Sequence, residues 1–527
     1  MAGGIAAAGL PAGTIGAAAD TTTDSAATTG LITVGPSSPQ YADLTQGFNI
    51  RWVGTPDAVM VAQTRDQVVQ VVQQAVKAGK RLTVRSGGHC FRDFVFNPDV
   101  NMVLDISQMK RIAFDPVQRA ISVEPGTTLG EVYQAVYRQW GVTIPAGSCP
   151  TVGIGGHVAG GGYGPLCRLF GLSVDHLCAV EVVVVDKYGN VKVVTATANP
   201  SDPNRDLWWA HTGGGGGSFG VVTKYFFRSP GATGTDPTQL LPRPPAQVLI
   251  STVQWPWAQM TAAGFAALVR NYGNWFTSNS APGSPLVSLF SHLVLTHQSN
   301  GTIEMNVQLD ASLPNVQQQL NAFIFGAVNA GVGFAPTTTE RRVRPWLHAT
   351  EWSGFIPGQP NGRSELKSAY LKTGLTDAQI AAVYASLTRT DYSNPLAQLN
   401  MIAFGGNVNS VPSSAAAFAH RDSVIILQYL AGWGLPTDDA THVGWVRKLY
   451  GDTFADTGGV PVPNAASDGT FINYADSDLN DTTINTSGVS WQTLYWKDNY
   501  PRLQQIKAKY DPTNFFRHAQ SIGLPGT

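Results

Sequence analysis

Short apolar runs alternate with amphipathic segments over the first half of the chain. Val59–Ala62 and Leu82–Val84 are apolar runs of strand length, and between them the apolar positions of Val68–Val76 recur at the spacing of one helix face. Thr64 with Gln67 three positions later is typical of a helix N-terminus, because both side chains can bind exposed backbone N–H groups. The pattern predicts a strand, a helix and a second strand in succession.

The same succession continues to about residue 230. Two further apolar runs predict strands at Val103–Ile106 and Ile121–Val123. Thr128 with Glu131 forms a second capping box and predicts the start of another helix. Val180–Val185 and Val191–Val194 flank a polar turn and therefore predict a β-hairpin. Helices and strands are thus mixed along this part of the chain, with many glycine turns between them.

The composition changes after residue 229. Residues 229–248 contain five Pro with several Gly and Thr, which is typical of a linker. Beyond it, Leu286–Leu295 and Ile303–Leu309 alternate between apolar and polar positions, which predicts an antiparallel sheet covered by helices on one face. The segment Tyr500–Phe516 begins as a short amphipathic helix. We predict an α+β fold with a first domain at 31–230, a second at 240–465 and a C-terminal segment at 466–527 that completes the first.

The first 30 residues are predicted to be a leader outside the fold. They are mainly Ala, Gly and Thr, and the first basic residue of the chain is Arg51. The weakly apolar stretch that ends at Ala17–Ala19 resembles the apolar core and cleavage site of a secretory signal, without its charged start. Export is therefore one expectation and a cytoplasmic location the other. No uninterrupted apolar run is long enough to predict a membrane span.

Charge and cysteine content exclude several classes of protein. Lys and Arg total 34 and Asp and Glu total 35, so a basic nucleic-acid surface is not expected. Hydrophobic residues make up 43% of the chain, which is enough for a large core and argues against disorder. Four Cys without a C-x-x-C pair predict neither a disulfide scaffold nor a zinc centre, and we predict no metal. The sequence leaves the oligomeric state open, a monomer included.

Three glycine-rich segments carry the strongest chemical signal: Arg85–Phe91, Gly147–Gly164 and Gly213–Gly220. Clustered glycines let backbone N–H groups approach an anion closely, and a diphosphate is the guest that such loops favour. The plainer interpretation is a set of tight turns. The third segment contains a G-x-G-x-x-G match, but it follows a predicted helix and precedes a predicted strand, which is the reverse of a dinucleotide-binding site. A Rossmann site is therefore not predicted there.

Two of these segments resemble a known family. The run Arg85-Ser86-Gly87-Gly88-His89 and the run Cys149–Gly164 resemble motifs of the berberine bridge enzyme-like flavin oxidases, which have the vanillyl-alcohol oxidase type of FAD fold. Asn473-Tyr474-x-Asp476 and Tyr510–Phe516 are similar to the C-terminal elements of that family. The resemblance covers about residues 40–525 and is nearest to antibiotic-tailoring members from actinomycetes. It implies a two-domain α+β FAD-linked oxidase.

The resemblance implies that FAD is attached through two covalent bonds, from His89 to the 8α-methyl carbon and from Cys149 to C6. Imidazole nitrogen and thiolate are side chains able to add to an electrophilic carbon. Apart from the resemblance, either residue has a plainer interpretation, as a turn histidine or a small packed thiol, and the latter is the one expected for Cys90. The other cofactor-binding residues that the resemblance implies are Arg85, Ser86, Gly87, Gly88, Val152, Gly155, Gly156, His157 and Asn514.

The catalytic residues implied by the resemblance are Tyr474 and Tyr163. Tyr474 would take the proton from a substrate hydroxyl while hydride leaves for flavin N5, and Tyr163 would be a hydrogen-bond partner or a second wall. A free tyrosine has a pKa of about 10, so a base at neutral pH needs charge or hydrogen bonding that favours the phenolate. Val152, three residues after the cysteine, is implied to admit O₂. We therefore expect an oxidase that releases hydrogen peroxide.

The substrate side departs from part of the family. No tyrosine lies near Gly405–Gly406, which puts a second tyrosine-dependent oxidation in doubt, and Gln398 or Asn400 could face the substrate instead. Trp346 and Trp352 could line an aromatic pocket, although core packing is the plainer interpretation. The basic run at 341–344 is expected to be a solvated face.

The expected function is conversion of an alcohol of a bulky secondary metabolite, a polyketide or a glycosylated antibiotic, to a ketone or aldehyde. Three alternatives stay open at this point. One is a carbohydrate oxidase that acts on a sugar hydroxyl, and another is an oxidative cyclase on the same flavin. The third is a flavin-binding module without catalysis, against which the retained Tyr474 and Val152 argue.

Overall fold

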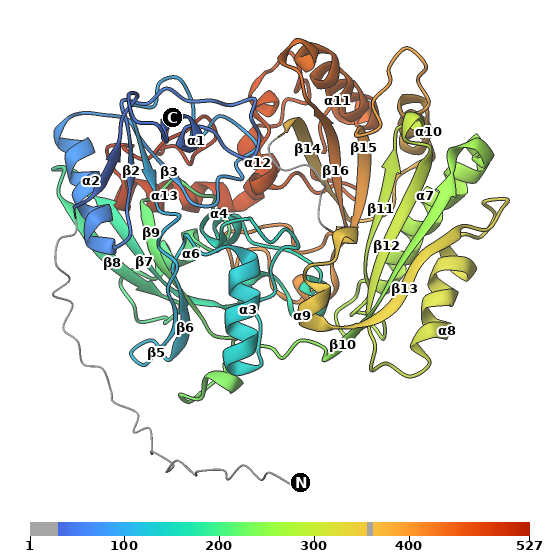
Figure 1. Ribbon diagram of the computed structural model, residues 1–527, viewed down its shortest axis with the longest axis horizontal. Coiled ribbons are helices and arrows are strands. Elements are labelled where there is room, and N and C mark those ends of the chain that lie inside the picture. The colour runs from blue at the N-terminus through green and yellow to red at the C-terminus, as the bar shows by residue number, and fades with distance from the viewer. Residues whose placement is uncertain (1–29, 356–361, 527) are drawn as a thin grey trace, which may run out of the picture. The chain divides into compact units, whose positions relative to one another are not determined.

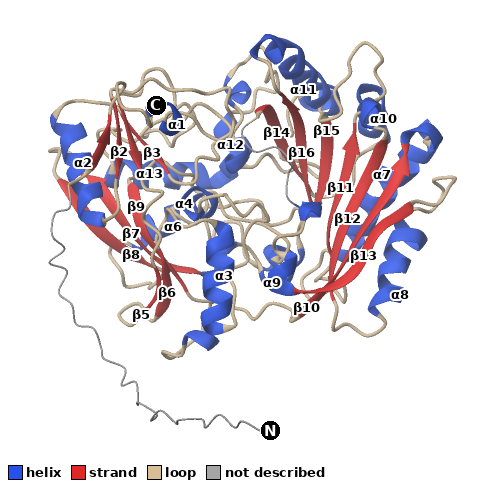
Figure 2. Cartoon of the chain, in the orientation of Figure 1, coloured by secondary structure: helices blue, strands red, loops and turns tan. Residues whose placement is uncertain are grey.

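The computed structural model describes residues 30–355 and 362–526 (Figure 1). The leader predicted at residues 1–30 lies outside this range except for Gly30. Residues from Ile32 onward form one compact unit, and its strands lie in three sheets (Figure 2). The α+β prediction is confirmed. No helix in the described part of the chain is both long and apolar enough to cross a membrane.

The first sheet has four strands in the order β1-β2-β4-β3. β2, β4 and β3 run parallel, and β1 is an antiparallel edge strand. Helix α2 connects β2 to β3, as predicted, and the Thr64 hydroxyl accepts the Gln67 N–H at its start. The Gln67 side chain binds the N–H of Gln63 rather than that of Thr64, which corrects half of the predicted capping box. The bounds are β1 Ile32–Val34, β2 Ala58–Val61, β3 Leu82–Arg85 and β4 Met102–Asp105.

The second sheet is antiparallel, in the order β5-β6-β9-β7-β8. The predicted hairpin is β7 with β8, and the predicted capping box of Thr128 with Glu131 begins α3. Helix α6 precedes β9, so the third glycine-rich segment follows a helix and precedes a strand, as expected. The bounds are β5 Ile112–Asp115, β6 Ala120–Val123, β7 Leu177–Val185, β8 Val191–Thr197 and β9 Val221–Phe227.

The third sheet is antiparallel and has seven strands, in the order β13-β10-β12-β11-β15-β16-β14. Helices cover one face of it (Figure 2); the Tyr272 hydroxyl of α7, for example, donates to the backbone of Ser291 and Met401 on β11 and β15. This confirms the predicted antiparallel sheet with helices on one face. The bounds are β10 Gln247–Pro256, β11 Phe290–Thr296, β12 Thr302–Asp310, β13 Thr337–Pro345, β14 Arg363–Leu371, β15 Gln398–Ala403 and β16 Ile425–Trp433.

The edge strand β13 contains the basic run at 341–344, and most of its side chains are at least partly exposed, as a solvated face requires. Trp346 and Trp352 are buried in the core, which confirms their plainer interpretation. The helices are α1 Tyr41–Leu44, α2 Arg65–Lys77, α3 Leu129–Trp140, α4 Ile154–Ala159, α5 Cys167–Phe170, α6 Arg205–Ala210, α7 Ala262–Asn279, α8 Val316–Asn321, α9 Trp346–Ala349, α10 Asp377–Leu387, α11 Asp439–Thr453, α12 Trp491–Trp496 and α13 Tyr500–Tyr510.

The C-terminal helix α13 packs against residues from the first half of the chain. Lys507 is buried, donates to the carbonyl of Ser218 (2.5 Å) and pairs with Asp511 (2.6 Å). The Tyr510 hydroxyl donates to Asn204 (3.0 Å). These contacts bring the end of the chain back to the third glycine-rich segment. The domain limits at 31–230, 240–465 and 466–527 stay a prediction.

Candidate functional site

A cavity of about 530 Å³ lies among the glycine-rich segments and the third sheet. Backbone from all three glycine-rich segments lines it, together with residues 471–475 and side chains from β11, β12, β15 and β16. The volume falls within the range of small-molecule and cofactor sites, about 300–1,000 Å³. The cavity therefore brings together parts of the chain that the sequence separates by several hundred residues.

Close backbone packing shapes the wall of the cavity. A Cβ on Gly87 would lie 2.2 Å from the nitrogen of Gly153, so the first two glycine-rich segments touch through their main chains. The Ser86 hydroxyl donates to the carbonyl of Pro125 (2.6 Å), which fixes the position of the first glycine-rich segment. A Cβ on Gly156, by contrast, would meet no atom within 4 Å. The wall therefore leaves room for a bound molecule at Gly156.

Arg85 lines this cavity with a donor still available. Its Nη1 donates to Asp105 (2.5 Å), whereas its buried Nε has no hydrogen-bond partner among the described residues. A diphosphate would satisfy such a donor. Together with the open glycine wall, this orphaned N–H fits the predicted FAD. Gly88 and Gly155 also line the cavity.

Asn514 lies close to the cavity in the chain, since Phe516 two positions later lines it. It does not line the cavity but sits in a turn after α13, with φ of 53°, where its N–H donates to the carbonyl of Asp511. Asparagine tolerates this left-handed conformation better than most residues. Its buried Oδ1 has no hydrogen-bond partner among the described residues, so the predicted cofactor contact of Asn514 stays a prediction.

His89 and Cys149 converge on one hydroxyl. His89 Nε2 lies 3.0 Å from Thr151 Oγ1, and Cys149 Sγ lies 3.5 Å from the same atom. The ring of Phe48 stacks on His89 with centroids 4.5 Å apart. Burial, with a smaller effect of the Arg85 charge, lowers the pKa of His89 to about 4. The imidazole is therefore neutral at pH 7, which is the form that can act as a nucleophile.

Tyr474 and Tyr163 meet in the same cavity through their hydroxyls, which lie 2.5 Å apart. Tyr474 ends a short turn, Ile472–Tyr474, and its ring packs edge-on against Phe91 and Phe471. Burial raises the pKa of Tyr474 to about 12, although the hydrogen bond from Tyr163 acts to lower it. Burial and the neighbouring Tyr474 raise the pKa of Tyr163 well above 10. Their mutual hydrogen bond thus acts to lower the pKa of Tyr474 and to raise that of Tyr163.

His157 and Val152 line the cavity. Both also make hydrogen bonds that fix the backbone around them. His157 Nε2 accepts the N–H of Gly147 (3.1 Å), and its carbonyl accepts the Asn473 amide (2.9 Å). The N–H of Val152 donates to the carbonyl of Cys149 (3.3 Å). His157 therefore connects the second glycine-rich segment to the residue beside Tyr474, and Asn473 was missed as a site residue although its motif had been noticed.

The half-buried ring of His157 is expected to make the fold sensitive to acid. Burial lowers its pKa from 6.5 to about 4, so the unfolded chain takes up a proton at a higher pH than the folded chain does. The stability that depends on a neutral ring is complete above pH 6.5 and is lost as the pH falls through 4. Thermal unfolding at pH values from about 7 to 4 should therefore show a falling midpoint.

His157→Gln is the matched variant for this prediction, because it keeps an acceptor for the Gly147 N–H but does not titrate. At about pH 4, the loss of unfolding free energy relative to pH 7 should be smaller in this variant by about 3 kcal/mol. The measurement is chemical denaturation at each pH. Equal losses in the two proteins would contradict the assignment.

The sheet presents a polar surface to the cavity. Asn400 Nδ2 donates to Gln428 (2.8 Å), and Asn306 Nδ2 donates to Glu304 (2.7 Å). The ring of His292 has no hydrogen-bond partner within the described residues, and burial lowers its pKa to about 3, so it is neutral. The polar side chains of this surface are His292, Glu304, Asn306, Gln398, Asn400 and Gln428. Of these, the sequence pointed only to Gln398 and Asn400.

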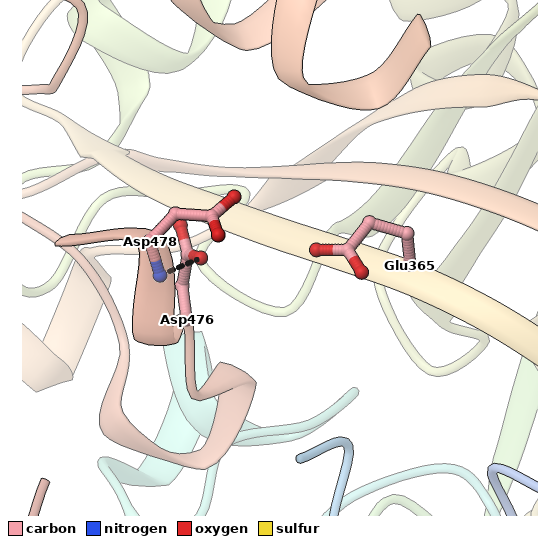
Figure 3. A group of neighbouring side chains, drawn as sticks. All are labelled: Glu365, Asp476 and Asp478. Carbon is pink, nitrogen blue, oxygen red and sulfur yellow. Dashed lines mark hydrogen bonds between the residues drawn. The ribbon is translucent and has the colours of Figure 1, made fainter. Parts of the chain in front are cut away.

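A buried cluster of three carboxylates, Glu365, Asp476 and Asp478, includes the residues that follow Tyr474 in the chain. In Figure 3 the carboxylate of Glu365 points towards those of Asp476 and Asp478, and one oxygen from each lies within 4.8 Å of the others. A set of this kind can hold a metal ion. Here cationic side chains already pair with all three: Arg51, Arg92, Lys367 and Arg447. The cluster is therefore an ion-pair network.

Comparison with known proteins agrees with this geometry. An FAD binding domain family matches residues 56–194, and the berberine and berberine-like family matches residues 470–523. Aclacinomycin-N/aclacinomycin-A oxidase of Streptomyces galilaeus is 50% identical over 501 residues, which is 95% of this chain and 91% of that protein. Hexose oxidase of Chondrus crispus is 30% identical over 531 residues, covering 92% and 93% of the two chains.

Among solved structures, a glycopeptide hexose oxidase complexed with teicoplanin has a TM-score of 0.89 at 48% identity, over 94% of this chain and 99% of that one. The cavity, the converging histidine and cysteine, and the match along nearly the whole chain lead to one assignment. The chain belongs to the berberine bridge enzyme-like family of FAD-dependent oxidases.

Proposed function

We propose that this chain oxidises an alcohol of a bulky secondary metabolite, a polyketide or a glycosylated antibiotic, to a ketone or aldehyde, with O₂ as acceptor and hydrogen peroxide as product. The observation that carries the proposal is the Tyr474–Tyr163 pair, which lies in the same cavity as His89 and Cys149. The names of the relatives, an aclacinomycin oxidase and a glycopeptide hexose oxidase, support this class of substrate.

His89 and Cys149 would hold FAD covalently, since both reach into the cavity and converge on Thr151. The glycine-rich wall and the free Nε–H of Arg85 would hold the diphosphate. Bound FAD supplies the hydride acceptor at N5 and is reoxidised by O₂, which is chemistry that no side chain provides. Val152, also in the wall, would leave O₂ access to this site.

Tyr474 would take the proton of the substrate hydroxyl. The Tyr163 hydroxyl lies 2.5 Å from the oxygen that must become phenolate and would donate a hydrogen bond to it once it is charged, which would stabilise that form. Burial opposes ionisation and raises the pKa of Tyr474 to about 12. Base catalysis of this kind should therefore strengthen as the pH rises towards that pKa.

A carbohydrate oxidase is the second candidate, and the polar surface of the sheet favours it. Asn400 and Gln428 pair across β15 and β16, Glu304 lies in the same row on the far side of Val294, and Asn306 is two residues further along β12. Such groups suit the hydroxyls of a sugar, whether it is free or attached to an antibiotic. The two candidates share the same chemistry and differ in the rest of the substrate.

The test is a peroxide assay with the purified flavin-loaded protein. Its panel contains glycosylated polyketides, glycopeptides, their aglycones and free oligosaccharides, with carbonyl product measured by mass spectrometry. We expect peroxide and carbonyl in equal amounts from glycosylated or polyketide alcohols. Turnover of free oligosaccharides alone would select the carbohydrate oxidase instead. Flavin reduction by these alcohols without peroxide formation in air would overturn the assignment as an oxidase.

A further inference from the structure

Arg92 connects the turn that carries His89 to the turn that carries Tyr474. It lies three residues after His89 and is only 5% exposed. Its Nε donates to the carbonyl of Ala475 (3.1 Å), and its Nη2 donates to Asp476 (2.9 Å). These two acceptors directly follow Tyr474 in the chain. One guanidinium therefore holds both turns.

The other side of the guanidinium is anchored on the third sheet. Arg92 forms a two-point contact with Glu365 on β14, at 2.5 and 3.1 Å. Lys367, two residues further along the same strand, also donates to Asp476, at 2.8 Å. Figure 3 shows Glu365 facing the turn that contains Asp476. The position of the Tyr474 turn is thus set by a rigid strand as well as by the first glycine-rich segment.

The positive charge of Arg92 stabilises its contacts with Glu365 and Asp476. Burial acts to lower the pKa of Arg92, but the carboxylates of Glu365 and Asp476 outweigh it and raise the pKa above its usual value. The guanidinium is therefore always charged. Removing one partner of such a buried pair leaves the other charges uncompensated, which weakens the whole arrangement.

Phe91 adds an apolar contact between the same two turns. Its ring packs edge-on against Tyr474, with centroids 5.9 Å apart. Its carbonyl accepts hydrogen bonds from Asn49 (3.0 Å) and Trp52 (2.9 Å), which fix it in place. Phe91 is thus fixed by its own hydrogen bonds and lies directly before Arg92 in the chain. A displacement of Arg92 would therefore also displace the ring that packs against Tyr474.

We propose that Arg92 is a positioning residue that sets the Tyr474 hydroxyl relative to His89. The inference rests on the proposed function, in which Tyr474 is the base and His89 fixes the cofactor. A guanidinium is needed because its planar fork donates in three directions at once, to Ala475, Asp476 and Glu365. A lysine has the charge without the fork. A displacement of about 1 Å in a reacting group can cost about 100-fold in rate.

The first test is hydrogen–deuterium exchange of the purified flavin-loaded protein, followed by mass spectrometry of peptides covering 471–478. Arg92→Lys should raise exchange in this segment by roughly tenfold. Arg421→Lys is the matched control, since Arg421 is equally buried and makes a two-point pair with Asp175 but contacts neither turn. Unchanged exchange at 471–478 in Arg92→Lys, or an equal rise in the control, would overturn the proposal.

The second test is a double-mutant cycle on the rate of flavin reduction. Arg92→Lys should lower kcat by about 10- to 100-fold with little change in KM, whereas in the Tyr474→Phe background it should have almost no further effect. Additive losses would mean that Arg92 does not act through Tyr474. Arg92→Met is a second variant, and if it fails to fold the lysine variant decides. Should Tyr474→Phe itself prove harmless, the base assignment fails, while the exchange experiment still tests the connection between the turns.

Discussion

Replacing Tyr474 by phenylalanine is expected to slow flavin reduction by about 1,000-fold while the flavin absorbance stays in place. The phenyl ring keeps the edge-on contacts with Phe91 and Phe471. What it loses is the oxygen that we propose as acceptor of the substrate proton, together with its hydrogen bond to Tyr163. Anaerobic stopped-flow measurement of the reductive step isolates this loss from reoxidation by O₂.

The pH dependence of the same step gives an independent check. With a pKa of about 12, Tyr474 is almost wholly neutral at pH 7, and its phenolate fraction rises tenfold for each pH unit below that pKa. The reduction rate of the wild type should therefore increase between about pH 7 and pH 10, and that of Tyr474→Phe should be flat. A flat profile in the wild type would contradict the base assignment.

Two other tyrosines serve as comparisons. Tyr163→Phe removes the hydrogen bond to the phenolate but not the base, so its rate should fall by about 10- to 100-fold and its pH profile should shift to higher pH. Tyr370 is fully buried and its hydroxyl has no partner among the described residues. Tyr370→Phe should therefore leave the rate unchanged. A loss in this control equal to that in Tyr474→Phe would point to general damage.

Local sequence patterns were sufficient for most of the scaffold. Val68–Val76 repeats its apolar residues with a clear helical period, and the hairpin at 177–197 has a long apolar strand beside a polar turn, so both were predicted. β5 was missed because Ile112–Asp115 has only half-buried side chains and too short an alternation to stand out. The hydrophobic pattern predicts a helix or strand well only where one face of that element is buried along several turns or residues.

The site itself depends on contacts that no local pattern contains. Tyr163 and Tyr474 are 311 positions apart, and Arg92 and Asp476 are 384 apart. The family resemblance supplied the residue types at His89, Cys149 and Tyr474, but the pairing of the two hydroxyls came only from the fold. A usable signal did exist for the polar surface, because Glu304 and Asn306 belong to the polar side of a strand that alternates between polar and apolar residues.

Asn514 illustrates what a motif resemblance alone leaves open. It belongs to a motif that resembles the family's tail, and this similarity led to a predicted cofactor contact. The structure also gives the motif a local role, since Asp511 accepts the N–H groups of Phe515 and Phe516 and closes the turn after α13. A shared motif can thus record the shape of a turn as well as a ligand, and the cofactor contact of Asn514 stays a prediction.

Attachment of the flavin is the prediction with the largest expected contrast. After acid denaturation, all of the yellow chromophore should stay with the wild-type polypeptide, and it should also stay in His89→Ala and in Cys149→Ala, because one bond is enough. In the double variant it should be released completely. The physical reason is that the neutral imidazole of His89 and the thiol of Cys149 approach the same hydroxyl of Thr151, so two nucleophiles can reach one bound ring system.

Cys90 is the matched control for this experiment. It is adjacent to His89 and lines the same cavity, but burial raises its thiol pKa to about 11, so it has little thiolate at pH 7 and is a poor nucleophile. Cys90→Ala should therefore keep all of its chromophore, and Cys90→Ala with His89→Ala should keep it as well, through Cys149. Loss of colour in that second pair would assign the sulfur link to Cys90. Release of the flavin from the wild type would show that neither side chain forms a bond and that the cavity holds FAD by its glycine-rich wall alone.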